Sequence, residues 1–114
     1  MNWIEITDNT DLNALKETSN AKPVMVFKHS TRCSVSSMVL NRLERSWSTE
    51  EAMDIQPYYL DLIRNRELSN RIAEVFEVQH QSPQVLIIRD GKVVYNNSHT
   101  NISFDNIKAA SRQN

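Results

Sequence analysis

The chain contains a single glycine, Gly91, among its 114 residues. Glycine lets the backbone approach a phosphate group closely, so motifs built from several glycines cannot occur here. The dinucleotide-binding fingerprint, the phosphate-binding P-loop and the kinase glycine-rich loop are therefore excluded. The glycine-flanked serine turn of the α/β-hydrolases is excluded for the same reason. Nucleotide chemistry by these usual routes is ruled out.

Composition and charge narrow the class further. With 39% hydrophobic and 24% charged residues, the sequence is typical of a globular chain, and its length predicts one domain over residues 1–114. The net charge of −1 argues against a dedicated nucleic-acid binder and against electrostatic attachment to a membrane. No signal peptide and no apolar run of about 20 residues is visible, so we expect a cytoplasmic protein.

Hydrophobic periodicity predicts alternating helices and strands. Two apolar runs joined by Asp90-Gly91 form the strongest hairpin signal in the chain, and the strand–helix–strand unit before them favours a parallel pair with a right-handed crossover. The expected fold class is therefore α/β, a central mixed β-sheet with helices on both faces. The expected elements are a short strand or extended lead-in at 2–7, a helix carrying Leu12 and Leu15, a strand at 24–27, a helix at about 33–48, a strand at 55–62, a helix carrying Leu68 to Phe76, strands at 85–88 and 93–95, and a final helix carrying Phe104 to Ala110.

Cap residues and one apolar stripe can also be assigned. One of Asp8, Thr10 and Asp11 is expected to cap the first helix, Asn65 the helix that follows the second strand, and Ser103 the last helix. The stripe expected to face the core from the helix at 33–48 consists of Val35, Val39, Leu43 and Trp47, widened by Met38 and Leu40.

Cys33 is the only cysteine, so an intrachain disulfide or a thiolate-rich metal centre built from this chain alone is excluded. It lies where a strand has ended and a long helix begins, and a helix N-terminus stabilises a thiolate. Arg32 and Lys28 add positive charge nearby. A reactive thiolate is the interpretation we favour, and a small buried apolar residue is the alternative.

Pro83 opens the strand at 85–88. Proline cannot donate to a sheet ladder, so it belongs at the first residue of a strand or in a turn. The Ser82–Pro83 bond is a candidate cis bond in such a tight entry, and an ordinary trans proline is the alternative.

With these two features, the chain resembles the bacilliredoxin C family (YtxJ-like proteins) of the thioredoxin-like superfamily. The stretch 27–36, Phe-Lys-His-Ser-Thr-Arg-Cys-Ser-Val-Ser, is similar to that family's Lys-His-Ser-Thr lead-in and its Thr-Cys-Pro-Ile-Ser type of active site. Ser82-Pro83, Arg89-Asp90-Gly91-Lys92, and Ser98-His99 with Ile102-Ser103 also resemble the family. The chain departs from the pattern by inserting Arg32 and by having Ser34 where proline is usual.

The resemblance implies a thioredoxin-like thiol–disulfide oxidoreductase that removes bacillithiol from mixed disulfides on client proteins. In such a protein Cys33 is the attacking cysteine, and Ser36 occupies the position of the second, resolving cysteine of dithiol relatives. Pro83 corresponds to the cis-proline, and Ser82 offers its backbone to an extended substrate. No bound cofactor is implied. The co-substrate is a low-molecular-weight thiol, and the partners are S-thiolated clients and a recycling thiol or reductase.

The residues agree with such a monothiol route. With no second cysteine, Cys33 would keep the small thiol until a second small thiol or another protein's thiol completes the cycle. Ser36 is interpreted either as a hydrogen-bond donor to the thiolate or as an ordinary polar residue of a first helical turn. Arg32 and Lys28 are candidate partners for the carboxylates of an acidic small thiol, or simply solvated side chains.

Other functions remain open at this stage. One alternative is a glutaredoxin-like iron–sulfur carrier, in which Cys33 and a small thiol hold a cluster between two protomers. Monothiol glutaredoxins of that kind have Gly-Phe after the cysteine, and here Ser34-Val35 stands in its place, which argues against this alternative. A non-catalytic interaction module with the same fold would show slow alkylation of Cys33 at neutral pH. The three histidines follow polar, loop-like sequence, and we do not expect them to bind a metal.

Overall fold

Strand β2 (Val24–His29) is the central element of the computed structural model, which describes residues 1–112, and all six of its residues are buried. Strand β3 (Gln56–Asp61) lies parallel to β2 on one side, and β4 (Gln84–Arg89) lies antiparallel on the other. Short strand β1 (Ile4–Glu5) pairs with β3, and β5 (Lys92–Ser98) pairs with β4, so the strand order is β1-β3-β2-β4-β5. The predicted mixed sheet with an antiparallel hairpin at one edge is confirmed.

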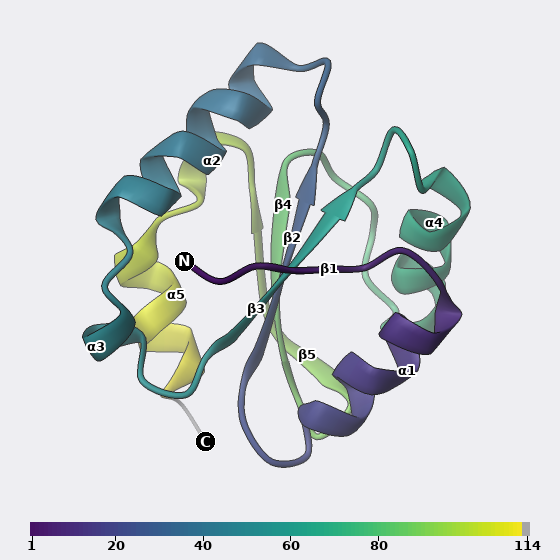
Figure 1. Cartoon of the computed structure of the whole chain (residues 1–114), viewed down its shortest axis with the longest axis horizontal. Helices are drawn as coiled ribbons and strands as arrows, with labels where there is room; N and C mark the ends of the chain where they lie inside the picture. Colours follow the sequence, from purple (N-terminus) through teal and green to yellow (C-terminus); the bar gives the residue numbers. More distant parts are fainter. Residues whose placement is uncertain (113–114) are drawn as a thin grey trace.

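Helices cover both faces of this sheet (Figure 1). On one face lie α1 (Asn9–Thr18) and α4 (Arg66–Val75). On the other lie α2 (Ser34–Ser46), the short α3 (Thr49–Ala52) and α5 (Phe104–Ser111). Among residues 1–112, no helix combines the length and the hydropathy that crossing a membrane requires.

The alternation of side chains along β2 divides the core into two clusters. Val24 and Val26 contribute to the cluster beneath α1 and α4, whereas Met25 and Phe27 contribute to the cluster beneath α2 and α5. Because β2 is covered on both faces, its sequence is continuously apolar until Lys28. Successive residues at its end therefore point into different halves of the protein.

The hairpin turn is where the single glycine is used. Asp90 and Gly91 both have positive φ, 52° and 74°, as a two-residue turn between antiparallel strands requires. The Asp90 N–H donates to the Ser19 carbonyl oxygen at 2.8 Å, and the Gly91 N–H donates to Ser19 Oγ at 2.9 Å. The turn is thereby attached to the end of α1.

Two of the expected helix caps are confirmed. Asp8 accepts a hydrogen bond from the Asp11 N–H at 3.0 Å, and Ser103 accepts one from the Asn106 N–H at 3.2 Å. Asn65 occupies the N-cap position of α4, but the expectation that its side chain caps the helix is wrong. Its backbone, with φ −122° and ψ 53°, is not in the extended conformation usual for a capping residue, so its side chain makes no capping bond.

The apolar stripe of the long helix is only partly confirmed. Val39 and Leu43 are buried against the sheet, whereas Val35 and Met38 are 40% and 47% exposed. The helix begins at Ser34, near the ends of the strands (Figure 1), and the buried face of its first turn is carried by Ser36, which contacts His29 of β2. Val35 and Met38 each precede a buried position by one residue, about 100° around the helix, and so lie off that face. The structure also contains α3 and a 3-10 turn, η1 (His99–Asn101), neither of which was expected from the sequence.

We predict that Gly91→Ala lowers the free energy of unfolding by about 1 kcal/mol, because a residue with a Cβ is strained at this positive φ. The added methyl group would lie 3.5 Å from Lys16 Cε, an ordinary contact, so the loss is conformational rather than steric. Urea unfolding followed by circular dichroism measures the change. Asp90→Gly, which removes a side chain from positive φ in the same turn, should cause no loss, and equal losses in both variants would contradict this explanation.

Candidate active site

Cys33 is the N-cap residue of α2. Its backbone is extended, its N–H donates to the Ser30 carbonyl oxygen at 3.1 Å, and its own carbonyl oxygen accepts from the Ser37 N–H at 3.1 Å. The side chain is partly exposed. An oxygen acceptor usually occupies this position, facing the free N–H groups of the first helical turn, and here a sulfur atom occupies it. The Cys33 side chain makes no capping hydrogen bond to that turn within the described residues.

The Ser82–Pro83 peptide bond is cis, so of the two alternatives the cis bond is the one observed. Because β4 runs antiparallel to β2, with Gln84 opposite Lys28, the start of β4 lies at the end of the sheet from which Cys33 follows. The Pro83 carbonyl oxygen accepts a hydrogen bond from the His99 N–H at 3.0 Å. Ser82 is partly exposed, and its main chain has no hydrogen-bond partner within residues 1–112. The structure therefore brings Cys33, Ser82 and Pro83 to one end of the sheet.

Ser36 lies beneath the loop that carries Cys33. It is fully buried, and its hydroxyl oxygen accepts a hydrogen bond from the Ser30 N–H at 3.1 Å. The same oxygen lies 2.7 Å from Nδ1 of His29. Within residues 1–112, His29 and Ser30 are the hydrogen-bond partners of the Ser36 hydroxyl, and no hydrogen bond joins it to Cys33. The hydroxyl therefore ties the first turn of α2 to the end of β2.

His29 is the residue of this site that sequence reasoning missed, because it was considered only as a metal ligand. It is buried, with its ring 5.8 Å from that of Tyr59 and 6.3 Å from that of Phe27. Burial lowers the pKa of His29, although the charges of Asp61 and Glu44 act in the opposite direction. The alternation of β2 was a usable signal, since it places His29 on the same face as Phe27, the face that α2 covers.

The protonation of His29 decides where the hydroxyl proton of Ser36 goes. When Nδ1 is unprotonated, the Ser36 hydroxyl donates to it. When Nδ1 carries a proton, the ring donates to Ser36, and the hydroxyl proton is released for another acceptor. The protonation state of His29 therefore sets the direction of the hydrogen bond between its ring and the Ser36 hydroxyl.

Lys28 lies away from the thiol, and the expectation that it binds a carboxylate of a small thiol is wrong. The side chain is fully buried, with Nζ donating to the Ser69 carbonyl oxygen at 3.2 Å. Burial lowers the pKa of Lys28 to about 8. Strand alternation directs it toward α4, on the face opposite to His29. Arg32 is exposed directly before Cys33, and its role in carboxylate binding stays a prediction.

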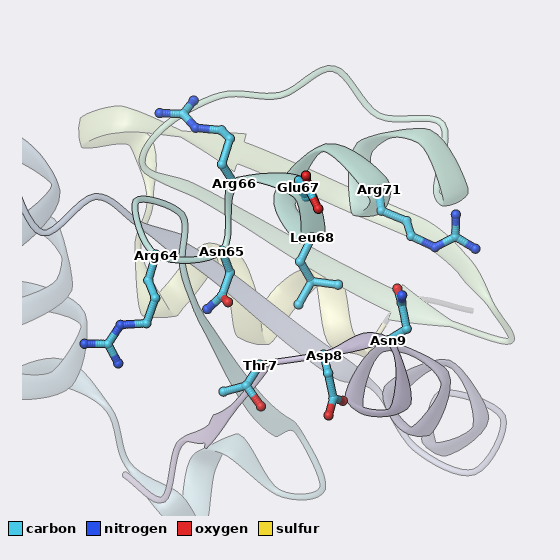
Figure 2. Close-up of a pocket in the computed structure, with 9 residues that line it drawn as sticks. All are labelled: Thr7, Asp8, Asn9, Arg64, Asn65, Arg66, Glu67, Leu68 and Arg71. Carbon is cyan, nitrogen blue, oxygen red and sulfur yellow. The ribbon is translucent and has the colours of Figure 1, made fainter.

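A cavity of about 450 Å³ lies between the starts of α1 and α4, and neither Cys33, Ser36 nor Pro83 lines it. Figure 2 shows the Asn65 side chain pointing into it and the guanidinium groups of Arg64, Arg66 and Arg71 pointing away from one another. Asn65 Nδ2 is buried without a hydrogen-bond partner among residues 1–112. Because the arginines do not converge, this cavity does not form a site for one anion. Within the same residues, no group of three or more histidine, cysteine or acidic side chains is arranged to hold a metal.

The fold and this site together define a thioredoxin-fold protein whose single cysteine begins the helix after the central strand, with a cis-proline opening the antiparallel hairpin. Residues 4–107 match the family model of the monothiol bacilliredoxin BrxC, and the chain belongs to that family.

Solved structures share this fold. A candidate oxidoreductase with a thioredoxin fold superposes with a TM-score of 0.80 at 30% identity, covering 95% of this chain and 92% of the other. Thioredoxin f from spinach chloroplasts gives a TM-score of 0.74 at 18% identity, over 97% and 87% of the two chains. Thioredoxin from Fasciola hepatica gives 0.72 at 17% identity, over 96% and 98%. The latter two similarities establish the fold alone.

We predict that Ser36→Ala lowers the free energy of unfolding by about 1–3 kcal/mol, because it leaves the buried Ser30 N–H and His29 Nδ1 without their partner. Ser34→Ala, at an exposed position in the same helical turn, is the matched control and should change stability by less than about 0.5 kcal/mol. Chemical denaturation measures both. Equal, small effects would show that the buried hydroxyl is not needed to satisfy these two groups.

Proposed function

We propose that this protein is a monothiol thiol–disulfide oxidoreductase that removes bacillithiol, or a similar low-molecular-weight thiol, from mixed disulfides on client proteins. The observation that carries the proposal is the position of the only cysteine. In a chain of the monothiol bacilliredoxin family, Cys33 is the N-cap of α2 at the end of the sheet where the cis Ser82–Pro83 bond lies.

The first step is a thiol–disulfide exchange. The Cys33 thiolate attacks the sulfur of the small thiol in a client–S–S–thiol adduct, so a new S–S bond forms on Cys33 as the old one breaks. The electron pair of the broken bond leaves with the client sulfur, which takes up a proton as the client thiol is restored. The small thiol is now carried by the enzyme.

The second step needs a thiol from outside the chain. Since Ser36 replaces a resolving cysteine, a second low-molecular-weight thiolate attacks the small-thiol sulfur of the Cys33 adduct. The products are the disulfide of the small thiol and the free Cys33 thiolate. Another protein's thiol can take the same role.

Recognition is proposed to use two groups near the thiol. The unpaired main chain of Ser82 suits an extended client segment, which would pair with it as a strand pairs with a sheet edge. The exposed guanidinium of Arg32 suits the carboxylates of an acidic small thiol such as bacillithiol.

The reaction can be tested by mixing the reduced protein briefly with a bacillithiolated client and measuring intact masses. We expect Cys33 to gain one bacillithiol as the client loses one, because the attack leaves the small thiol on Cys33. Cys33→Ser should abolish the transfer, and a glutathionylated client should react more slowly.

The other outcomes are informative. Equal transfer from both clients would leave the oxidoreductase assignment intact and refute the preference for bacillithiol. An absence of transfer from a Cys33 that reacts readily with iodoacetamide would contradict the enzymatic assignment and favour an interaction module.

We further predict that Ser36→Cys converts the monothiol cycle into a dithiol one. The introduced thiol should attack Cys33 in the bacillithiol adduct and release bacillithiol, leaving an intrachain disulfide that mass spectrometry detects as the loss of two hydrogens. Ser37→Cys, one residue further along α2, is the matched control and should retain the adduct. Persistence of the adduct in Ser36→Cys would mean that position 36 does not reach the sulfur of Cys33.

A further inference from the structure

Two buried polar residues lie directly opposite each other on the strands that end at the site. Lys28 of β2 and Gln84 of β4 are partners in the antiparallel register, and both are fully buried. They point to the face covered by α1 and α4, because Val26, two residues before Lys28, and Leu86, two residues after Gln84, belong to the core cluster there. This is the face opposite to His29 and Ser36.

The Gln84 side chain bonds to the main chain on both sides of residue 80. Its Nε2 donates to the Gln79 carbonyl oxygen at 2.9 Å, and its Oε1 accepts from the Gln81 N–H at 3.3 Å. One amide therefore satisfies a carbonyl and an N–H of a segment that belongs to no helix or strand.

Lys28 forms a hydrogen bond with His80, the residue between Gln79 and Gln81. Its Nζ lies 3.4 Å from Nδ1 of His80, and an ammonium group can only donate, so a neutral His80 accepts this bond. The pKa of His80 is lowered by burial and by the charges of Lys28 and Arg66, which keeps the ring neutral. Lys28 also donates to the Ser69 carbonyl oxygen, and Ser69 Oγ lies 3.3 Å from the same ring nitrogen, so the contact extends to α4.

Three consecutive residues, 79 to 81, are thus each bonded by one member of this cross-strand pair. The next residue is Ser82, whose main chain is unpaired among residues 1–112, and the cis bond to Pro83 follows. We propose that Lys28 and Gln84 are positioning residues that hold residues 79–81, and thereby present the Ser82 main chain to an extended client at the end of the sheet where Cys33 lies. The inference deepens the proposed function and rests on it.

The chemistry of the pair supports a role beyond core packing. Burying an ammonium group and an amide carries a desolvation cost, and apolar residues of similar size would fill the same space without it. The bonds that compensate for this cost are directed to 79–81 and Ser69, and none of them is made to an acidic side chain. The polar atoms are therefore placed where they fix that segment.

The test compares the wild-type protein with Gln84→Leu and Lys28→Met, using two kinds of substrate. One is a bacillithiolated client peptide, which needs docking, and the other is hydroxyethyl disulfide, which has no peptide backbone. For each variant we expect the KM for the peptide to rise about tenfold, the effect of losing one or two hydrogen bonds at the docking segment. Reaction with hydroxyethyl disulfide and alkylation of Cys33 by iodoacetamide should stay within about twofold of wild type.

Leu86→Ala is the matched control, since it weakens the same face of β4 without touching residues 79–81. It should lower stability and leave the KM for the peptide unchanged. A parallel rise of KM in Leu86→Ala, or an equal loss of reaction with both substrates in Gln84→Leu, would overturn the positioning role in favour of general destabilisation.

Amide hydrogen exchange separates this inference from the proposed function. In the wild-type protein the Gln81 N–H should exchange slowly, and Gln84→Leu should accelerate it about tenfold through loss of its acceptor. Wild-type protein that fails to react with the client would refute the function, whereas unchanged exchange at Gln81 would refute the positioning role. If Gln84→Leu does not fold, Gln84→Glu keeps an acceptor for the Gln81 N–H and loses the donor to the Gln79 carbonyl oxygen, so exchange at Gln81 should stay slow while the KM for the peptide rises. An unchanged KM in that variant would refute the positioning role of the bond to Gln79.

Discussion

The antiparallel pairing of β4 with β2 is the constraint on which the rest of the site depends. Strands β2 and β3 are parallel, so the segments that follow them emerge at one end of the sheet. Reversing the direction of β4 brings its start, rather than its end, to the same place. Cys33, which follows one strand, and Pro83, which precedes another, therefore lie at the same end of the sheet although they are 50 positions apart in the sequence. A slip of one residue in this register would turn every side chain of β4 to the opposite face.

The same pairing assigns two polar networks to opposite faces of the sheet. His29 points toward α2 and contacts Ser36, which holds the loop that carries the thiol. Lys28, its neighbour, points toward α4 and with Gln84 holds the segment before the cis bond. Adjacent residues of one strand thus support the two sides of the proposed reaction, the sulfur and the docking segment. Because the networks share no hydrogen bond among residues 1–112, we expect substitutions in one to leave the other largely intact.

The fold and the main elements of the site were predictable because they depend on local signals. Continuous apolar runs indicated buried strands, Asp90-Gly91 indicated the hairpin, and the change from strand to helix placed Cys33 at a helix N-terminus. The position of Lys28 was not predictable in this way, since a lysine at the end of a strand is usually solvated and its partners lie 41 and 52 residues away. The exposure of Val35 also depends on tertiary structure, because apolar periodicity does not reveal that the polar Ser36, bonded to His29, carries the buried face of the first turn.

Position 36 shows how a monothiol site differs physically from a dithiol one. A serine hydroxyl is a stronger hydrogen-bonding group than a thiol, and here it is buried between the Ser30 N–H and His29 Nδ1. A cysteine at this position would satisfy both groups less well, but it would supply a second sulfur for internal resolution. The loop that carries Cys33 is therefore held by two hydrogen bonds of Ser36, and the single cysteine leaves no internal route for releasing an adduct. Under the proposed function, the enzyme stays in its thiolated form until an external thiol arrives, so the supply of that thiol governs how fast the cycle turns.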